Sequence, residues 1–235
     1  MFQGFTDETF DFFIAIGFNN NRDFFHANHD WYLRAVREPC LALAADLSAA
    51  VEEVDDTLER RPRRVVSRIN RDLRYSHDKT PYRDYLWLAF GHPGETSAAS
   101  PGIYFEIRRD AACYGMGFYG ENRLLMNGLR RNLISEPRRF LEKWLPLREE
   151  FPLTTRSYKR MKIPEALQPD LKDWYCARDF YVEKELRDFR LLKSPALADE
   201  ISEGFRRLAP LYRYFRDLTP VPDEDTTRYE PAERV

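Results

Sequence analysis

The run Y-L-W-L-A-F at Tyr85–Phe90, followed by Ile103–Ile107 and Cys113–Tyr119, decides the fold class of this 235-residue chain. The first run is short and rich in aromatic and aliphatic residues. Charged residues precede it and a segment rich in glycine and proline follows, a pattern that predicts a β-strand. The other two runs flank Arg108–Ala112 and predict a hairpin. Glycines in its second arm indicate a bulge or a close approach of backbone. An antiparallel sheet is therefore expected in the middle of the chain.

Helices are predicted on both sides of these strands. Before them, apolar residues recur at helical spacing from Glu8 to Val54, with a cap at Asn19–Asn21 and Pro39 in the first turn of a helix. Helices packed on an antiparallel sheet define an α+β fold. The later predicted elements are helices around Leu125–Leu133, Phe140–Leu145, Asp170–Ala177 and Ser194–Phe215, and extended segments at Thr154–Met161 and Phe180–Val182.

The chain contains neither an internal repeat nor a low-complexity linker, so a single α+β domain is expected over residues 1–218. Residues 219–235 differ, because they carry Pro220, Pro222 and Pro231, many charges and few apolar side chains. This composition predicts a flexible C-terminal tail.

Composition narrows the class of protein. Hydrophobic residues make up 43% and aromatic residues 14%, enough for a sizeable core. The net charge of −2 and the pI of about 6.2 give no global electrostatic reason to expect a nucleic-acid binder. Cys40, Cys113 and Cys176 are separated in sequence and lie among apolar residues, so we expect reduced thiols without disulfides, structural zinc or a cofactor. Neither a signal peptide nor a membrane-spanning run is recognisable, which favours a cytoplasmic protein.

The stretch from Arg68 to Tyr82, R-I-N-R-D-L-R-Y-S-H-D-K-T-P-Y, concentrates ionisable and aromatic side chains. Its secondary structure is ambiguous, because apolar residues recur every four positions, as in a helix, while its β-branched residues favour a strand. Arg68 and Asp72 share a face in either conformation, since they are four residues apart. Pro81 favours an extended residue before it, which predicts a loop at Asp78–Pro81 that enters the following strand.

This stretch carries a resemblance to a known family. The pattern Arg68-x-x-Arg71-Asp72-x-Arg74-Tyr75-x-x-Asp78-Lys79-x-x-Tyr82 resembles the signature R-x-x-R-D-x-R-F-x-x-x-[DN]-K-x-x-Y of domain-of-unknown-function family 2461. The chain has two residues where the signature has three, and tyrosine where it has phenylalanine. Phe2-x-Gly4-Phe5, Asn20-Asn21-Arg22-x-x-Phe25 and Gly115-x-Gly117 also resemble parts of that family. The resemblance covers most of the chain, weakens after Arg160, and implies no assigned activity.

Two interpretations of the motif follow from its chemistry. In the first, the protein has a pocket that binds an anionic or phosphorylated small molecule, because guanidinium groups clamp phosphate and carboxylate in bidentate fashion. The residues expected to form this pocket are Arg68, Arg71, Arg74 and Lys79 as anion contacts, Asp72 and Asp78 as orienting groups or as the acid and base of a reaction, and Tyr82 as a hydrogen-bonding or stacking group. In the second, the same residues pair with one another, and the protein is an interaction module.

Other constellations give weaker predictions. Arg60–Arg64 invites a nucleic-acid interpretation, but the adjacent acidic run favours local pairing. Ser76 and Lys79 have the spacing of a serine enzyme without its partner motifs, and His77 is a candidate general base. Cys113 lacks a nearby cation that would activate it as a nucleophile. The trio Asp23, His26 and Asp30 shares a helical face, but a second cluster to complete a metal site is missing from the sequence. The sequence leaves the oligomeric state and the occurrence of catalysis open.

Overall fold

The computed structural model describes residues 1–74 and 78–222, and its fold is α+β, as predicted. Five strands form one antiparallel sheet, in the order β1 (Tyr85–Phe90), β2 (Gly102–Arg108), β3 (Ala112–Phe118), β5 (Phe180–Leu186) and β4 (Leu153–Thr154). The chain divides into two compact units. Unit 1 comprises residues 1–90, 103–114 and 185–206, and unit 2 comprises residues 91–102, 115–184 and 207–235.

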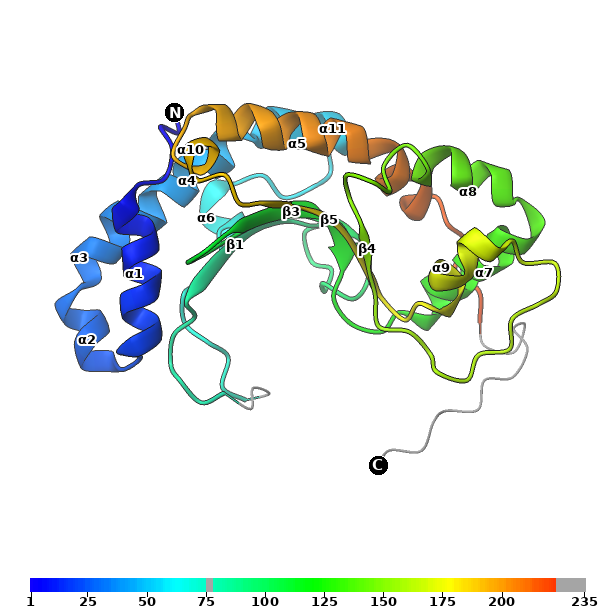
Figure 1. Cartoon of the computed structure of the whole chain (residues 1–235), viewed down its shortest axis with the longest axis horizontal. Helices are drawn as coiled ribbons and strands as arrows, with labels where there is room; N and C mark the ends of the chain where they lie inside the picture. Colours follow the sequence, from blue (N-terminus) through cyan, green and yellow to red (C-terminus); the bar gives the residue numbers. More distant parts are fainter. Residues whose placement is uncertain (75–77, 223–235) are drawn as a thin grey trace. The chain divides into compact units, whose positions relative to one another are not determined.

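Unit 1 contains the helical N-terminal third of the chain together with β1, most of β2 and the first turns of the last helix (Figure 1). Asn21 caps the second helix by accepting a hydrogen bond from the backbone N–H of Phe24, and Pro39 lies in the first turn of the fourth. Its helices are α1 (Asp7–Phe18), α2 (Arg22–Ala27), α3 (His29–Tyr32), the π-helix η1 (Leu33–Arg37), α4 (Glu38–Asp46), α5 (Ser48–Val54), α6 (Pro62–Val65), α10 (Phe189–Leu192) and the start of α11 (Ala196–Arg216).

The core of unit 1 lies between the helices and one face of the sheet. Alternate residues of β1, Leu86, Leu88 and Phe90, are buried, and the Phe90 ring meets Phe205 of α11 edge to face at 6.0 Å. Figure 1 shows α5 and α11 together on this side of β1, and Arg206 of α11 pairs with a glutamate of α5. The sheet is therefore covered here by helices on one face.

Unit 2 is built around Trp174, which is fully buried. Its indole meets the rings of Phe140, Phe180 and Phe215 at centroid distances of 5.1, 5.0 and 5.7 Å. These aromatic residues come from different elements, so the cluster ties the unit's helices to β5. The helices of unit 2 are α7 (Arg123–Ser135), α8 (Pro137–Trp144), the 3₁₀ helix η2 (Pro169–Leu171), α9 (Lys172–Cys176) and the end of α11.

Gly115 and Gly117 of β3 allow a close approach of two strands. A Cβ atom on Gly115 would lie 2.1 Å from the carbonyl oxygen of Val182, and one on Gly117 would lie 2.3 Å from that of Phe180. Any other residue would push β3 and β5 apart. The predicted close backbone approach at these glycines is confirmed.

Most predicted elements are confirmed, one ambiguous segment is resolved, and one predicted extended segment is confirmed only in part. Residues 66–70, where helix and strand competed, are extended and form isolated bridges to Leu88 and Tyr82. Of the segment Thr154–Met161, only Thr154 belongs to a strand, with a further bridge at Ser157. Among the described helices, none is both long and apolar enough to cross a membrane.

Candidate functional site

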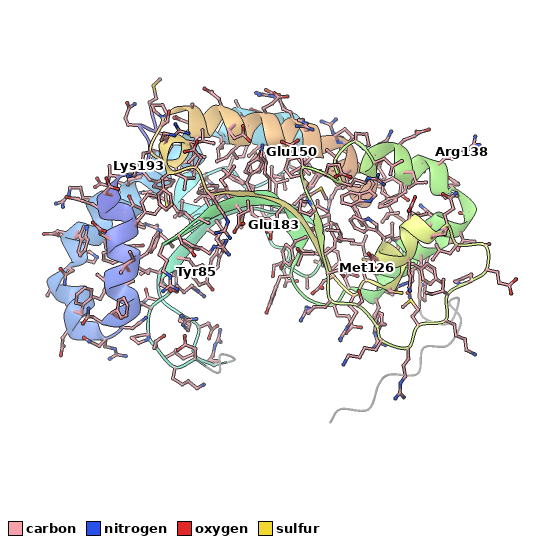
Figure 2. The ribbon with its side chains drawn as sticks, viewed as in Figure 1. Tyr85, Met126, Arg138, Glu150, Glu183 and Lys193 are labelled. Carbon is pink, nitrogen blue, oxygen red and sulfur yellow. The ribbon has the colours of Figure 1, made fainter. Side chains whose placement is uncertain are left out.

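The Arg68–Tyr82 motif lies in an arm that projects from β1, on the side away from α5 and α11 (Figure 1). We use "the arm" for residues 66–84, of which 75–77 are not described, so the predictions for Tyr75, Ser76 and His77 lie outside the described residues. The arm has two antiparallel segments, one before and one after residues 75–77. Backbone hydrogen bonds join them, from Arg71 N to Pro81 O at 2.9 Å and from Arg83 N to Ile69 O at 2.8 Å. The second segment leads into β1 at Tyr85 (Figure 2).

The side chain of Arg71 also joins the two segments of the arm. Its Nη2 donates to the backbone carbonyl of Tyr82 at 3.2 Å and lies 3.1 Å from the carboxylate of Asp78. The Arg71 side chain is 16% exposed, so its contacts are sheltered from solvent more than those of the other motif cations. The Nε atom of Arg71 is buried and has no hydrogen-bond partner among the described residues.

The other charged residues of the motif also pair within it. Arg74 forms a bidentate contact with Asp72, at 3.0 and 2.7 Å, and this contact lowers the pKa of Asp72 to about 2. Hydrogen bonds from the backbone and hydroxyl of Thr80, reinforced by the charge of Arg71, lower the pKa of Asp78. Lys79 donates to the carbonyl of Leu73 at 2.9 Å.

Tyr82 connects the arm to the N-terminal helices. The side-chain amide of Asn20 accepts from the N–H of Tyr82 at 3.0 Å and donates to its carbonyl at 2.9 Å, as a neighbouring strand would. The Tyr82 ring is buried and stacks on Phe25 at 4.3 Å. The two sequence motifs that resemble the family, one around Asn20–Phe25 and one ending at Tyr82, are therefore in direct contact.

Arg68 and the upstream arginine run take separate places. The carbonyl of Arg68 accepts from Arg83 at 2.9 Å, while its side chain is exposed and forms no ion pair with a described residue. In the run at Arg60–Arg64, Arg60 pairs with Glu52 and Arg61 with Glu59, so much of its charge is balanced locally. A shallow depression beside α6 is lined by Arg61, Pro62, Arg63 and Arg64 together with Leu41 and Ala42.

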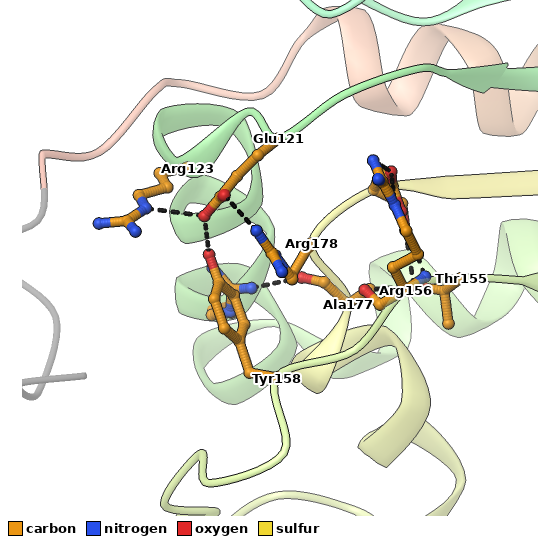
Figure 3. Close-up of polar contacts among 9 residues, drawn as sticks. Glu121, Arg123, Thr155, Arg156, Tyr158, Ala177 and Arg178 are labelled. Atoms are coloured by element: carbon orange, nitrogen blue, oxygen red, sulfur yellow. Dashed lines mark hydrogen bonds and ion pairs between the residues drawn. The ribbon is translucent and has the colours of Figure 1, made fainter. Parts of the chain in front are cut away.

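A second polar cluster lies in unit 2 and centres on Glu121 (Figure 3). Its carboxylate accepts hydrogen bonds from the Tyr158 hydroxyl, from Arg178 Nη2 at 2.6 Å and from Arg123 Nε at 2.8 Å. Burial acts to raise the pKa of Glu121, but these donors outweigh it and lower the pKa to about 2. The guanidinium groups of Arg130 and Arg178 lie 5.5 and 5.3 Å from the centroid of the Tyr158 ring.

Arg130 is the most deeply buried cation of this cluster, with 2% of its surface exposed. It donates through Nε to the carbonyl of Tyr175 at 2.8 Å, through Nη2 to the carbonyl of Ala177, and through Nη1 to Asn127 Oδ1 at 2.8 Å. Both carbonyls belong to the C-terminal end of α9, where a cation is favourable. The side chain of Arg130 therefore caps the C-terminal end of α9 and joins this helix to α7.

Arg156 completes the cluster through the nearly fully buried Asp179. Its Nε and Nη2 both donate to Oδ2 of that carboxylate, its backbone N–H donates to Oδ1 at 3.2 Å, and its backbone carbonyl accepts from Arg178 N at 2.7 Å. Sequence reasoning did not single out any of these residues as a site, because they come from distant segments and form no local motif.

The described residues give no support to the weaker predictions of a metal site. Their His, Cys, Asp and Glu side chains form no group of three or more that could hold a metal ion, and this includes Asp23, His26 and Asp30. Burial raises the pKa of Cys40 to about 12 and also raises that of Cys176, whereas a nucleophilic thiol needs a lowered pKa.

Comparison with known proteins agrees with the resemblance carried by the arm. The family model described as "Conserved hypothetical protein (DUF2461)" matches residues 8–214, most of the chain. The chain belongs to the DUF2461 family. The match spans the Asn20–Phe25 segment, the arm and the Glu121 cluster, so all three are features of a member of this family. No curated protein matches the chain.

Proposed function

We propose that the arm motif is a structural network, and that this DUF2461 protein is an interaction module that acts by binding a partner at its surface. One observation carries the proposal. Arg71, the most sheltered cation of the motif, bonds the backbone of Tyr82 and the carboxylate of Asp78, and both partners belong to the arm itself.

The competing interpretation is a pocket that binds an anionic small molecule. It requires that Arg68, Arg71, Arg74 and Lys79 face a common ligand. Three of these cations already have partners within the arm, and a ligand would have to displace those contacts. The buried Tyr82 ring stacks on Phe25 and is thereby occupied as well. These contacts favour the structural interpretation.

The two interpretations predict different behaviour for Arg71→Ala, with Arg68→Ala as the matched control. Arg71→Ala removes a sheltered charge-assisted contact, so the free energy of unfolding should fall by about 1–2 kcal/mol in urea denaturation. Arg68→Ala should leave it unchanged, because that side chain is exposed. If instead Arg71→Ala keeps full stability and abolishes binding of inorganic phosphate in a calorimetric titration, the anion pocket is correct and the structural proposal is wrong.

A further inference from the structure

Unit 2 has a positive net charge, although the chain as a whole is slightly acidic. Over residues 91–102, 115–184 and 207–235 it has 19 Lys and Arg against 17 Asp and Glu, which gives +2. Unit 1 has 18 against 22, which gives −4. Unit 2 is therefore the more basic of the two units, and a surface that attracts an anionic partner is sought there.

Six basic side chains of unit 2 belong to the Glu121 cluster or to the segment that follows Tyr158 in the sequence, and we call them the basic surface: Arg123, Arg156, Lys159, Arg160, Lys162 and Arg178. Arg123 and Arg178 share the carboxylate of Glu121, and Arg156 and Arg178 are joined through their backbones. The three remaining residues directly follow Tyr158, whose hydroxyl also reaches Glu121. The surface is therefore held together by contacts within the unit.

Two carboxylates, Glu121 and Asp179, balance only part of this charge. Lys159, Arg160 and Lys162 are all exposed, and they form no ion pair with a residue that the structure describes. Ammonium and guanidinium groups held in this way are available to the phosphates of a polyanion, which bind by releasing condensed counterions.

An exposed aromatic ring adjoins the same surface. Tyr119 is 66% exposed, and the guanidinium of Arg156 lies 5.6 Å from the centroid of its ring. The backbone N–H of Tyr119 donates to the carbonyl of Ser97 at 2.9 Å, which fixes the segment that carries the ring. Aromatic side chains beside a basic track are how proteins bind single-stranded nucleic acid, because each base can stack on a ring.

We infer that the basic surface of unit 2, with Tyr119, binds single-stranded nucleic acid. This inference rests on the proposed function, since it names the surface and the partner class of the interaction module. An acidic protein segment would satisfy the cations equally well, but it would leave the exposed ring at Tyr119 without a role. The ring therefore favours bases and phosphates together over carboxylates alone.

The test is fluorescence anisotropy of the full-length protein with a labelled single-stranded oligonucleotide, as DNA and as RNA, over a range of salt concentrations. The expected result is binding that weakens with salt. Lys159→Ala/Arg160→Ala should weaken it at least tenfold and reduce the slope of log affinity against log salt by about 1.4, since each phosphate contact on a single strand contributes about 0.7. Arg131→Ala/Arg138→Ala, which removes two exposed arginines of α7 and α8 (Arg138 points outward in Figure 2), is the matched control and should bind normally.

Tyr119→Ala separates nucleic acid from other polyanions. It should weaken oligonucleotide binding severalfold and leave binding of polyglutamate unchanged. The same titrations with Asp223→Asn/Glu224→Gln/Asp225→Asn ensure that the chain's own acidic residues do not mask the surface. The inference is overturned if neither the unmodified protein nor this variant binds the oligonucleotide at low salt. It is also overturned if Lys159→Ala/Arg160→Ala and Arg131→Ala/Arg138→Ala lose the same affinity, or if polyglutamate binds as tightly as the oligonucleotide. None of these results alters the unfolding of Arg71→Ala, so the proposed function is judged separately.

Discussion

The arm of unit 1 and the Glu121 cluster of unit 2 are both networks of arginine and carboxylate, yet they differ in how the chain assembles them. In the arm, Arg74 contacts a residue two positions away, and Arg71 contacts one eleven positions away. In the cluster, Arg178 and Glu121 are 57 residues apart, and Arg130 and Ala177 are 47 apart. The arm can therefore be recognised as a motif in the sequence, whereas the residues of the cluster come together only in the folded chain.

The two regions also differ in exposure, which decides their energetic weight. The Arg74 side chain is 76% exposed, whereas Arg130 is almost entirely buried. Exposed ion pairs contribute little to stability, while hydrogen bonds of a buried charge are costly to remove. The residues that are easiest to recognise in this sequence are thus, for the most part, not those expected to matter most for folding.

The largest expected effect is that of Arg130→Met. The substitution keeps an apolar stem but leaves the carbonyls of Tyr175 and Ala177 without their buried donor. We expect a loss of about 3 kcal/mol in the free energy of unfolding, measured by urea denaturation. Arg131→Met, at the exposed neighbouring position of α7, is the control and should have little effect. Equal stability of the two variants would remove the proposed contrast between buried and exposed arginines.

An intermediate effect on the free energy of unfolding is expected when acid protonates Glu121. Because the folded-state pKa of Glu121 lies below its usual value of 4.5, the carboxylate stabilises the fold above about pH 4.5, and this contribution is lost as the pH falls toward about 2. Solvent screening of a partly exposed group reduces it to about 1–2 kcal/mol. Unfolding curves between pH 5 and pH 2 should show that Glu121→Gln loses this part of the acid dependence. Glu165→Gln, at an exposed position, should retain it, and identical profiles for the two variants would contradict the role of Glu121.

The smallest effect is expected at the exposed pair of the arm. Arg74→Ala breaks the bidentate contact with Asp72, but solvent replaces it at little cost. The melting temperature should stay within experimental error of the unmodified protein. A clear drop in melting temperature would mean that the exposed half of the motif also stabilises the fold.

Much of the fold could be predicted because its signals are local. The strand at Tyr85–Phe90 was predicted with its observed bounds, and the apolar stripe from Ile201 to Phe215 is buried along α11. The prediction was ambiguous at residues 66–70, because backbone pairing with Tyr82 and Leu88, which no local pattern reveals, makes them extended. Tyr82 and Asn20 are separated by 62 residues in the sequence, and their contact too arises only from the fold.

The site predictions divide in the same way. The motif residues could be chosen from sequence, but their partners could not, since Arg71 uses a backbone carbonyl that carries no sequence signal. Arg130 lies in the helix predicted around Leu125–Leu133, and nothing in the sequence of that helix distinguishes it from the exposed Arg131 beside it.

The most direct measurement of whether Arg71 holds the arm together is amide hydrogen exchange at Arg83, which donates across the arm to Ile69, and at Ser67, which donates to Trp87 of β1. In Arg71→Ala we expect the Arg83 amide to exchange about tenfold faster, because local opening becomes easier by about 1.4 kcal/mol. In Arg68→Ala both amides should exchange as in the unmodified protein. Unchanged exchange at Arg83 in Arg71→Ala would contradict the structural role of the motif.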